Sequence, residues 1–259
     1  MGRAIAVDWS GAASAGEQRR KIWVASAHDG SLVTLTSGRT RSATVDHLLD
    51  LLDAWPDAVV GLDFSFSFPA WWLESLGISH VRSAWDLAAS QGSEWLAGCP
   101  PPFWGRPGRA RQISPPLGYR RTELALTPRP GSVFQIGGAG SVGTASIRGM
   151  PHLRRLAEAG VAIWPFDPWP DSASGRGPVV AEVWPRLSIG SVVKSRAQAR
   201  VDHLHQAGFA PALLAQAVAS DDAFDAACAA VSLSASSLAA GYDELDAIDR
   251  LEGRILVSE

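Results

Sequence analysis

Two short apolar segments that each end in an aspartate constrain the fold of this chain more than any other feature. Residues 3–8 (RAIAVD) and 58–63 (AVVGLD) have the pattern of strands, and the second has no polar residue before its final acid. Such a run is typical of a strand that is buried on both faces in a parallel sheet. Because ligands of open α/β sheets bind at the carboxyl ends of the strands, Asp8 and Asp63 are candidate site residues.

The segments around these two strands predict a mixed α/β order. Residues 21–27 and 31–36 are β-rich and are separated by His28-Asp29-Gly30, a hairpin signal that predicts an opening three-strand meander. Apolar residues at helical spacing predict a helix over 43–54. Further strands are expected over 132–136, 161–166 and 179–184, and further helices over 151–159, 195–207 and from Asp221, after the N-cap Ser220, to Gly241.

Residues 64–131 interrupt this order. The segment is rich in Pro, Gly and Arg after residue 98 and lacks strong periodicity, and a stretch of this length is usually functional or mobile. Its hydrophobic pattern is too weak to predict a separate core. The 259 residues, of which 46% are hydrophobic and 19% charged, suit one large domain or two small ones. We therefore interpret 1–259 as a single domain that carries 64–131 as an insertion.

The composition excludes several classes of protein. A net charge of −3 does not suit a protein that coats nucleic acid through bulk charge, although a local basic patch is compatible with it. The two cysteines favour a reducing cytoplasm over a disulfide framework, and no segment approaches the roughly 18 apolar residues of a membrane span. We expect a cytoplasmic protein with no membrane partner, and the sequence leaves its oligomeric state open. The basic residues are almost all Arg, and the only lysines are Lys21 and Lys194.

Three further acids are placed to join the two strand-end aspartates. Glu182 lies in another apolar strand, and Asp222 and Asp225 are three residues apart on one face of a helix. The small residues 226–230 would let that helix press closely on the sheet. Converging carboxylates repel one another, and one or two hard divalent cations are their natural counter-charge. The alternative is that strand-end acids accept loop amides and that acids of a first helical turn complement the helix dipole.

Five sequence motifs stand in order along nearly the whole chain: AVDWSGA, GLDFSFSFP, SVFQIGGAGSVGTASIRGMPHLRRL, AEVWPR and DAFDAACAAV. Together they resemble a family of uncharacterised proteins described as predicted nucleases with an RNase H-like fold. The resemblance implies an RNase H-like mixed sheet flanked by helices. The Asp-x-x-Asp pair of the last helix is most similar to the RuvC-type resolvase arm of that superfamily.

The resemblance also implies a metal site. The positions that match the superfamily's metal ligands are Asp8, Asp63, Asp222 and Asp225. Glu182 is an additional acid with an implied catalytic role. RuvC-type enzymes usually carry Glu at the position of Asp63, so this chain departs from them by a shorter side chain. The implied cofactor is Mg²⁺ or Mn²⁺, because two such ions about 4 Å apart support in-line displacement at phosphorus.

Residues 138–143 (GAGSVG) match the G-x-G-x-x-G pattern of dinucleotide-binding proteins. Two observations argue against that function: Pro151 predicts a helix that starts well beyond the glycines, and the motif follows a meander that a dinucleotide-binding unit does not need. An actin-like phosphotransferase is a second interpretation, because such proteins share the RNase H-like core and have a glycine-rich nucleotide loop. The second half-domain that they require is missing at this length. The third interpretation is a tight turn whose amides approach a phosphate, with Gly138 and Gly140 as contacts.

Residues 103–121 combine arginines with interleaved aromatic side chains and contain no acid. Arg and aromatic residues together suit phosphates and stacked bases, whereas the alternative is a solvated loop in an Arg-rich protein. The candidate substrate contacts are Arg106, Arg109, Arg111, Arg120 and Arg121. We therefore expect a divalent-metal-dependent nuclease that acts on DNA or RNA. The alternatives are an actin-like phosphotransferase and a non-catalytic nucleic-acid-binding protein of the same fold.

Overall fold

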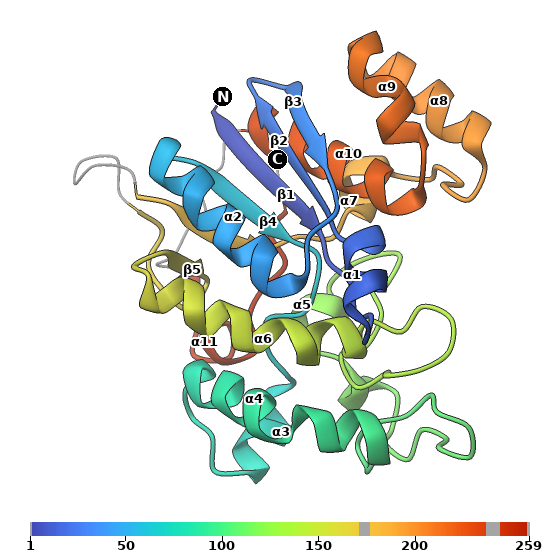
Figure 1. Ribbon diagram of the computed structural model, residues 1–259. Coiled ribbons are helices and arrows are strands. Elements are labelled where there is room, and N and C mark those ends of the chain that lie inside the picture. Colours follow the sequence, from blue (N-terminus) through green and yellow to red (C-terminus); the bar gives the residue numbers. More distant parts are fainter. Residues whose placement is uncertain (1, 171–176, 237–243, 258–259) are drawn as a thin grey trace. The chain divides into compact units, whose positions relative to one another are not determined.

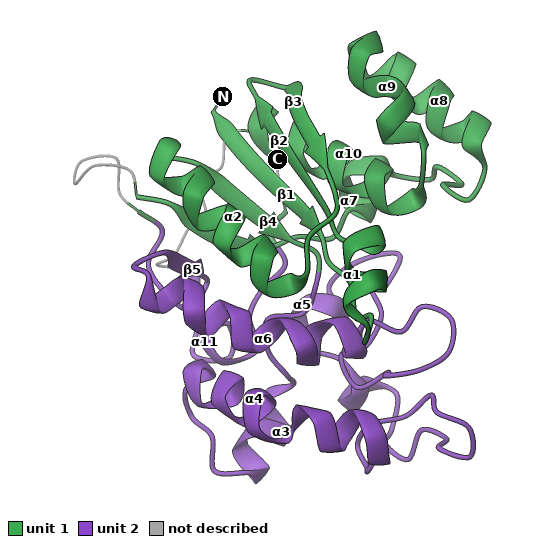
Figure 2. Cartoon of the chain, viewed as in Figure 1, with its two compact units in different colours: residues 1–63, 170–240, 256–259 green, residues 64–169, 241–255 purple. Residues whose placement is uncertain are grey.

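The computed structural model describes residues 2–170, 177–236 and 244–257, which form two compact units (Figures 1 and 2). Unit 1 is drawn from residues 1–63, 170–240 and 256–259, and unit 2 from residues 64–169 and 241–255. Unit 2 begins where the predicted insertion begins. It continues past the end of that insertion and includes a segment from near the C-terminus.

Five strands of unit 1 form a mixed sheet in the order β3-β2-β1-β4-β6. β1 pairs antiparallel with β2, and β2 with β3, whereas β4 is parallel to both β1 and β6. The strands are β1 (Arg3–Asp8), β2 (Trp23–His28), β3 (Ser31–Thr36), β4 (Val59–Leu62) and β6 (Val179–Glu182). The predicted α/β class, in which an antiparallel meander is followed by parallel strands, is confirmed.

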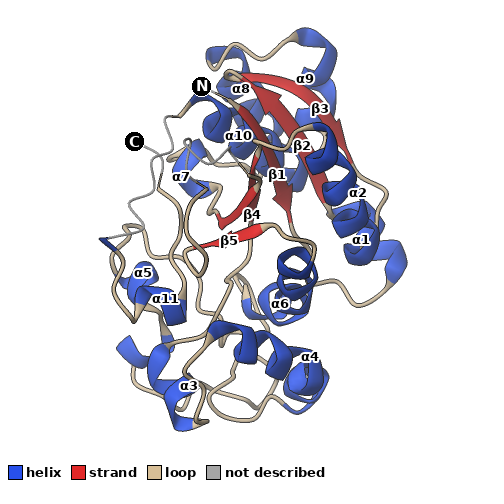
Figure 3. Cartoon of the chain, turned by 90° about the vertical axis from the view of Figure 1, so that its left-hand side faces the viewer, coloured by secondary structure: helices blue, strands red, loops and turns tan. Residues whose placement is uncertain are grey.

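Helices cover both faces of this sheet. In two views of unit 1, α2 lies on one side of the strands and α10 on the other (Figures 1 and 3). The helices of unit 1 are α1 (Ala15–Lys21), α2 (Arg41–Ala54), α7 (Arg186–Ile189), α8 (Ala197–Gln206), α9 (Pro211–Val218) and α10 (Asp221–Ala235). The predicted helices over 43–54 and 195–207 are confirmed as α2 and α8. The sequence pattern does not predict α1, because this short helix buries only Gln18 and has no apolar stripe.

α10 begins where the sequence predicts it. The Ser220 hydroxyl accepts a hydrogen bond from the Ala223 backbone N–H at 3.0 Å, which is the expected N-cap. The helix ends earlier than predicted, at Ala235, because Ser236 adopts an extended backbone. The predicted C-cap, Gly241, lies outside the described residues.

α10 packs on a sheet face that is made of very small residues. Gly61 of β4 belongs to this face, because a Cβ added there would lie 2.7 Å from Leu233 Cδ1 of α10. Strand register and the alternation of side chains assign four buried alanines to the same face. These are Ala4, Ala6, Ala25 and Ala27. The helix meets them with its own small, buried residues, which include Ala223, Ala226, Ala227 and Ala230. Small residues on both sides allow the helix axis to approach the sheet closely.

We predict that Gly61→Ala destabilises the protein by about 1–3 kcal/mol, which is the usual cost of overpacking a filled core. The added methyl group would lie 2.7 Å from both Leu233 Cδ1 and Val183 Cγ1, so these buried side chains or the elements that carry them have to shift. Urea unfolding measures the difference. Gly16→Ala is the matched control, since Gly16 is an exposed position of α1 with open space around it and alanine there should be neutral or stabilising. Equal stability of the Gly61 variant and wild type would contradict the close packing.

Unit 2 has an aromatic core. Phe68 and Trp72 have ring centroids 4.7 Å apart, and Phe103 stacks on Trp95 at 5.3 Å. Its elements are α3 (Ala70–Ser75), α4 (Val81–Gly98), the 3₁₀ turn η1 (Pro116–Gly118), α5 (Arg121–Leu124), α6 (Gly143–Glu158), β5 (Ala162–Trp164) and α11 (Asp249–Glu252). The sequence pattern hides this core, because several of its aromatic residues lie in irregular segments rather than at a helical or strand period.

Two elements predicted for unit 2 are wrong in detail. The expected strand over 132–136 is a turn, with one isolated bridge between Trp104 and Gln135. The expected helix over 151–159 begins at Gly143, inside the glycine run, and Pro151 lies in its interior. Packing of the buried face of α6 outweighs the hydrogen bond that proline removes.

None of the helices in the described parts of the two units is both long and apolar enough to cross a membrane. Cys99 and Cys228 are both free and buried, which agrees with the expected lack of a disulfide framework.

Candidate functional site

The register of the sheet sets Asp8 and Asp63 side by side. Val7 of β1 is the partner of Leu62 of β4, and the Asp63 N–H donates to the Val7 carbonyl at 3.2 Å. The next residue of each strand is the aspartate, so both carboxylates leave the sheet at its carboxyl edge. By alternation they lie on the face of Gly61, which α10 covers.

α10 brings two more carboxylates to this edge. Asp222 lies in its first turn and Asp225 lies one turn further, where it is only 3% exposed. Asp63, Asp222 and Asp225 all act on Asp8 through their negative charge. The structure therefore brings together the four aspartates that the sequence analysis proposed as metal ligands, and all four belong to unit 1.

Glu182 is separated from these four by strand register. It pairs with Leu62 on the neighbouring parallel strand, so its side chain belongs to the sheet face opposite to that of Asp63. It is buried, and its charge still raises the pKa of Asp63. The opposite orientation of Glu182 and Asp63 follows from the pairing of β4 with β6, so it can be predicted only when the strand register is known.

The acids shift one another's pKa upward. Burial raises the pKa of Asp63 to about 7, and the charges of Asp225 and Glu182 add to the shift. Burial, followed by the charges of Asp63 and Asp222, raises the pKa of Asp8 well above its usual value. The pKa values of Asp222 and Asp225 are also raised, chiefly by burial. Without a bound cation, the cluster therefore retains protons that exposed aspartates would lose.

Lys194 is the functional residue that the sequence analysis missed. Its ammonium group donates to Asp225 Oδ2, and its charge lowers the pKa of all four clustered aspartates. The side chain is 41% exposed, so one end of it reaches solvent while Nζ lies on the carboxylate. The signal was present in the composition, because Lys194 is one of two lysines in a chain whose other basic residues are arginines.

Arg200 fastens the loop of Lys194 to the start of α10. Its buried guanidinium donates to the Lys194 carbonyl, to Asp221 Oδ1 at 2.8 Å and to the Val218 carbonyl at 2.8 and 3.0 Å. The Arg200 guanidinium group thus bonds to three segments of unit 1, at Lys194, Val218 and Asp221. This arrangement holds the backbone of Lys194 at a fixed place relative to the helix that carries Asp225.

The donor chemistry of the cluster fits a hard divalent cation. Carboxylate oxygens are the ligands that Mg²⁺ and Mn²⁺ prefer, and Asp225 Oδ1 is buried with no hydrogen-bond partner in the described part of the chain. As the side chains stand, no group of three or more acidic, His or Cys residues within the described ranges is arranged to hold a metal. In this arrangement the Lys194 ammonium group contacts the cluster at Asp225.

The predicted substrate arginines all belong to unit 2 and have different environments. Arg120 is 0% exposed, pairs with Glu123 at 2.8 Å and donates to the Glu252 carbonyl at 3.0 Å. A side chain with no exposed surface cannot meet a substrate, so we assign Arg120 to the internal structure of unit 2. Arg121 is engaged by two acids, Asp246 at 2.5 Å and Asp249 at 2.8 Å.

The other three arginines are more accessible. Arg111 lies over the rings of Trp104 and Tyr119, at 4.8 and 5.5 Å from the centroids, and donates to the Ser114 carbonyl. Arg106 and Arg109 are exposed, and no partner for their guanidinium groups is found among the described residues. These two arginines retain the properties expected of phosphate contacts.

The glycine-rich loop has local structural explanations. Gly138 and Gly140 have φ of +78° and +71°, which favour glycine. A Cβ on Gly143 would lie 2.2 Å from the Val133 carbonyl oxygen. Because α6 begins inside the glycine run, the predicted late helix no longer argues against dinucleotide binding. The turn at 132–136 argues against it instead, since the dinucleotide fingerprint requires a strand there.

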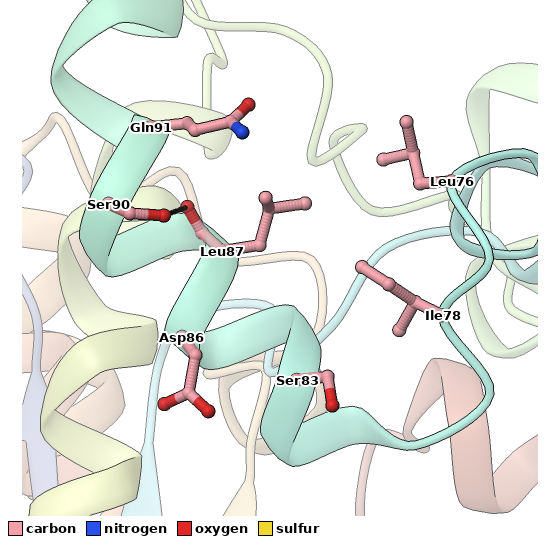
Figure 4. A pocket seen from close by; sticks show the side chains of 7 residues that line it. All are labelled: Leu76, Ile78, Ser83, Asp86, Leu87, Ser90 and Gln91. Atoms are coloured by element: carbon pink, nitrogen blue, oxygen red, sulfur yellow. Dashed lines mark hydrogen bonds between the residues drawn. The ribbon is translucent and has the colours of Figure 1, made fainter.

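A pocket of about 600 Å³ lies between α4 and the segment after α3, and contains none of the predicted site residues (Figure 4). Leu76, Ile78 and Leu87 line it together with Ser83 and Asp86. Its mixed lining has no set of convergent polar groups of the kind that orients a small ligand.

Comparisons with known proteins add no assignment. No protein-family model matches the chain, and neither a curated protein nor a solved structure matches it.

The raised pKa of Asp63 predicts how stability depends on pH. A carboxyl whose pKa is higher in the folded than in the unfolded state stabilises the fold below its unfolded pKa, and this contribution is lost as pH rises through the folded pKa. In EDTA, the free energy of unfolding should therefore fall between about pH 4 and 8.

The matched variants are Asp63→Asn and Asp53→Asn, the second being an exposed acid of α2. Asp63→Asn should flatten the decline, measured by urea unfolding at several pH values, and Asp53→Asn should leave it unchanged. If the free energy of unfolding falls with pH equally in both variants, the raised pKa of Asp63 does not cause the fall.

Proposed function

We propose that this protein is a divalent-metal-dependent phosphodiesterase that acts on nucleic acid, with Mg²⁺ or Mn²⁺ held by Asp8, Asp63, Asp222 and Asp225. One observation carries the proposal: four carboxylates from β1, β4 and α10 converge at the carboxyl edge of the sheet, where Asp63, Asp222 and Asp225 all raise the pKa of Asp8. An RNase H-like identity for the fold is part of this proposal, and the mixed strand order supports it.

A purely structural role explains this convergence poorly. Burial and mutual repulsion raise the pKa of each aspartate, so the ionised cluster destabilises the fold that contains it. Asparagine at the same positions would avoid that cost. Residues that cost stability and converge at the ligand-binding edge of a sheet are typical of functional sites.

The proposed mechanism needs no protein nucleophile. When bound, a pair of divalent cations would activate water and stabilise the leaving oxygen of a phosphodiester. Asp8 and Asp63 provide oxygens from adjacent strands, whose pairing fixes their separation. Asp222 and Asp225 provide oxygens from a helix that is packed rigidly on the same sheet face. The carboxylates must be ionised to bind the metal, so activity should rise with pH as their protons are lost.

Nucleic acid is the proposed partner because of the basic residues of unit 2. Arg106 and Arg109 present exposed guanidinium groups, and Arg111 stacks on aromatic rings beside them in the sequence. Such groups suit phosphates and bases. DNA and RNA are both consistent with this chemistry.

The proposal predicts that Asp8→Asn abolishes metal-dependent cleavage. Wild-type protein with Mg²⁺ or Mn²⁺ should cleave at least one substrate in a panel of single-stranded, duplex and branched DNA and RNA. Asp8→Asn, which keeps the size of the side chain, should reduce the rate by about 100-fold or more, since the lost ligand acts on the transition state. Asp53→Asn should retain the wild-type rate.

Three outcomes would contradict the proposal. Cleavage that survives in Asp8→Asn would assign it to a contaminant or to another site. Absence of cleavage, combined with a rise in melting temperature on adding Mg-ATP, would favour a phosphotransferase, because a ligand stabilises only a state that binds it. Nucleic-acid binding that requires no metal and gives no cleavage would identify a non-catalytic binding protein.

A further inference from the structure

The Lys194 ammonium group contacts one of the four aspartates that we propose as metal ligands. It is bonded to Asp225 Oδ2, while Oδ1 of the same carboxylate is buried and has no hydrogen-bond partner among the residues that the structure describes. Asp225 is 3% exposed, so bulk water does not compensate the free oxygen. One oxygen of this carboxylate is thus neutralised by the chain itself, and the other carries an unmet capacity to accept a ligand.

We propose that Lys194 is the resident counter-cation of the acidic cluster and that a divalent cation binds by displacing its ammonium group from Asp225. This inference rests on the proposed metal site and adds its regulation. A cation that contacts carboxylate oxygens lies within about 2.0–2.6 Å of them. An ammonium group on the same carboxylate would then face the metal at short range and repel it, so the two cations compete for Asp225.

The environment of Lys194 suits such an exchange. The side chain is 41% exposed, so its ammonium group can move from Asp225 into solvent without crossing the core. The backbone stays in place, because Arg200 holds the Lys194 carbonyl and Asp221 together. The Lys194 side chain can therefore leave Asp225 while its backbone stays in place. It stabilises the cluster when metal is scarce and raises the metal concentration at which the site fills.

Mn²⁺ binding to matched variants tests the proposal. Lys194→Met removes the charge and keeps the length of the side chain, and Lys194→Arg keeps the charge. Lys21→Met makes the same change at the only other lysine, whose charge acts on Asp222 but which is not bonded to Asp225. Isothermal titration calorimetry with Mn²⁺ should give Lys194→Met a dissociation constant about tenfold lower than that of wild type, since one charge-assisted hydrogen bond no longer competes. Lys21→Met and Lys194→Arg should stay within about threefold of wild type.

Stability in EDTA provides an independent readout. Lys194→Met should melt at a lower temperature than Lys21→Met at neutral pH, because its cluster has lost the bonded counter-charge. Saturating Mn²⁺ should then raise its melting temperature by more than it raises that of wild type.

Lysine-selective ¹³C labelling follows the displacement in the unmodified chain, even where a variant fails to fold. Wild-type protein contains two lysines, so Lys21→Met identifies the signal of Lys194. Titration with diamagnetic Mg²⁺ should move the Lys194 ε-carbon signal toward that of a solvated lysine and leave the Lys21 signal in place.

The outcomes separate this inference from the proposed function. Mn²⁺ binding that Asp225→Asn abolishes but Lys194→Met leaves unchanged or weakens would overturn the displacement and keep the metal site. A Lys194 signal that does not move at saturating Mg²⁺ would do the same. Absence of Mn²⁺ binding to wild type and to Lys194→Met alike would overturn both the metal site and the inference.

Discussion

The close approach of α10 to the sheet is the constraint on which the candidate site depends. Alanines and Gly61 on the sheet face meet alanines on the helix, so the helix lies nearer to the strands than larger residues would permit. Asp222 and Asp225 stand at the helix end that lies over the carboxyl edge of β1 and β4. Bulkier residues at this interface would lift the helix and separate its carboxylates from Asp8 and Asp63.

The chain balances the resulting charge in three ways. Raised pKa values keep protons on part of the cluster, Lys194 donates to Asp225, and Arg200 neutralises Asp221 beside it. Each device works without a metal, which explains how a fold with this many converging acids remains stable. A bound divalent cation would weaken the first two, because it would compete with protons and with the ammonium group for the same oxygens. The pair of Arg200 and Asp221 would remain.

Local sequence pattern predicted the part of the fold that depends on short-range signals. The acids at the ends of β1 and β4, the Ser220 N-cap and the small face of α10 follow from strand period, capping chemistry and side-chain size. Lys194 could not be placed in this way, since it lies in a loop whose position depends on the long-range bonds of Arg200. Arg120 was predicted as a substrate contact for the same reason: its sequence is basic, but only the folded structure shows that it is buried against Glu123. The aromatic core of unit 2 was missed because its rings follow no period.

The most direct test of this account is anomalous diffraction from crystals grown or soaked in Mn²⁺. The account predicts anomalous density contacted by the carboxylates of Asp8, Asp63 and Asp225, with the Lys194 ammonium group released from Asp225. Manganese-soaked crystals without anomalous density at these carboxylates, in which Lys194 still bonds Asp225, would contradict it.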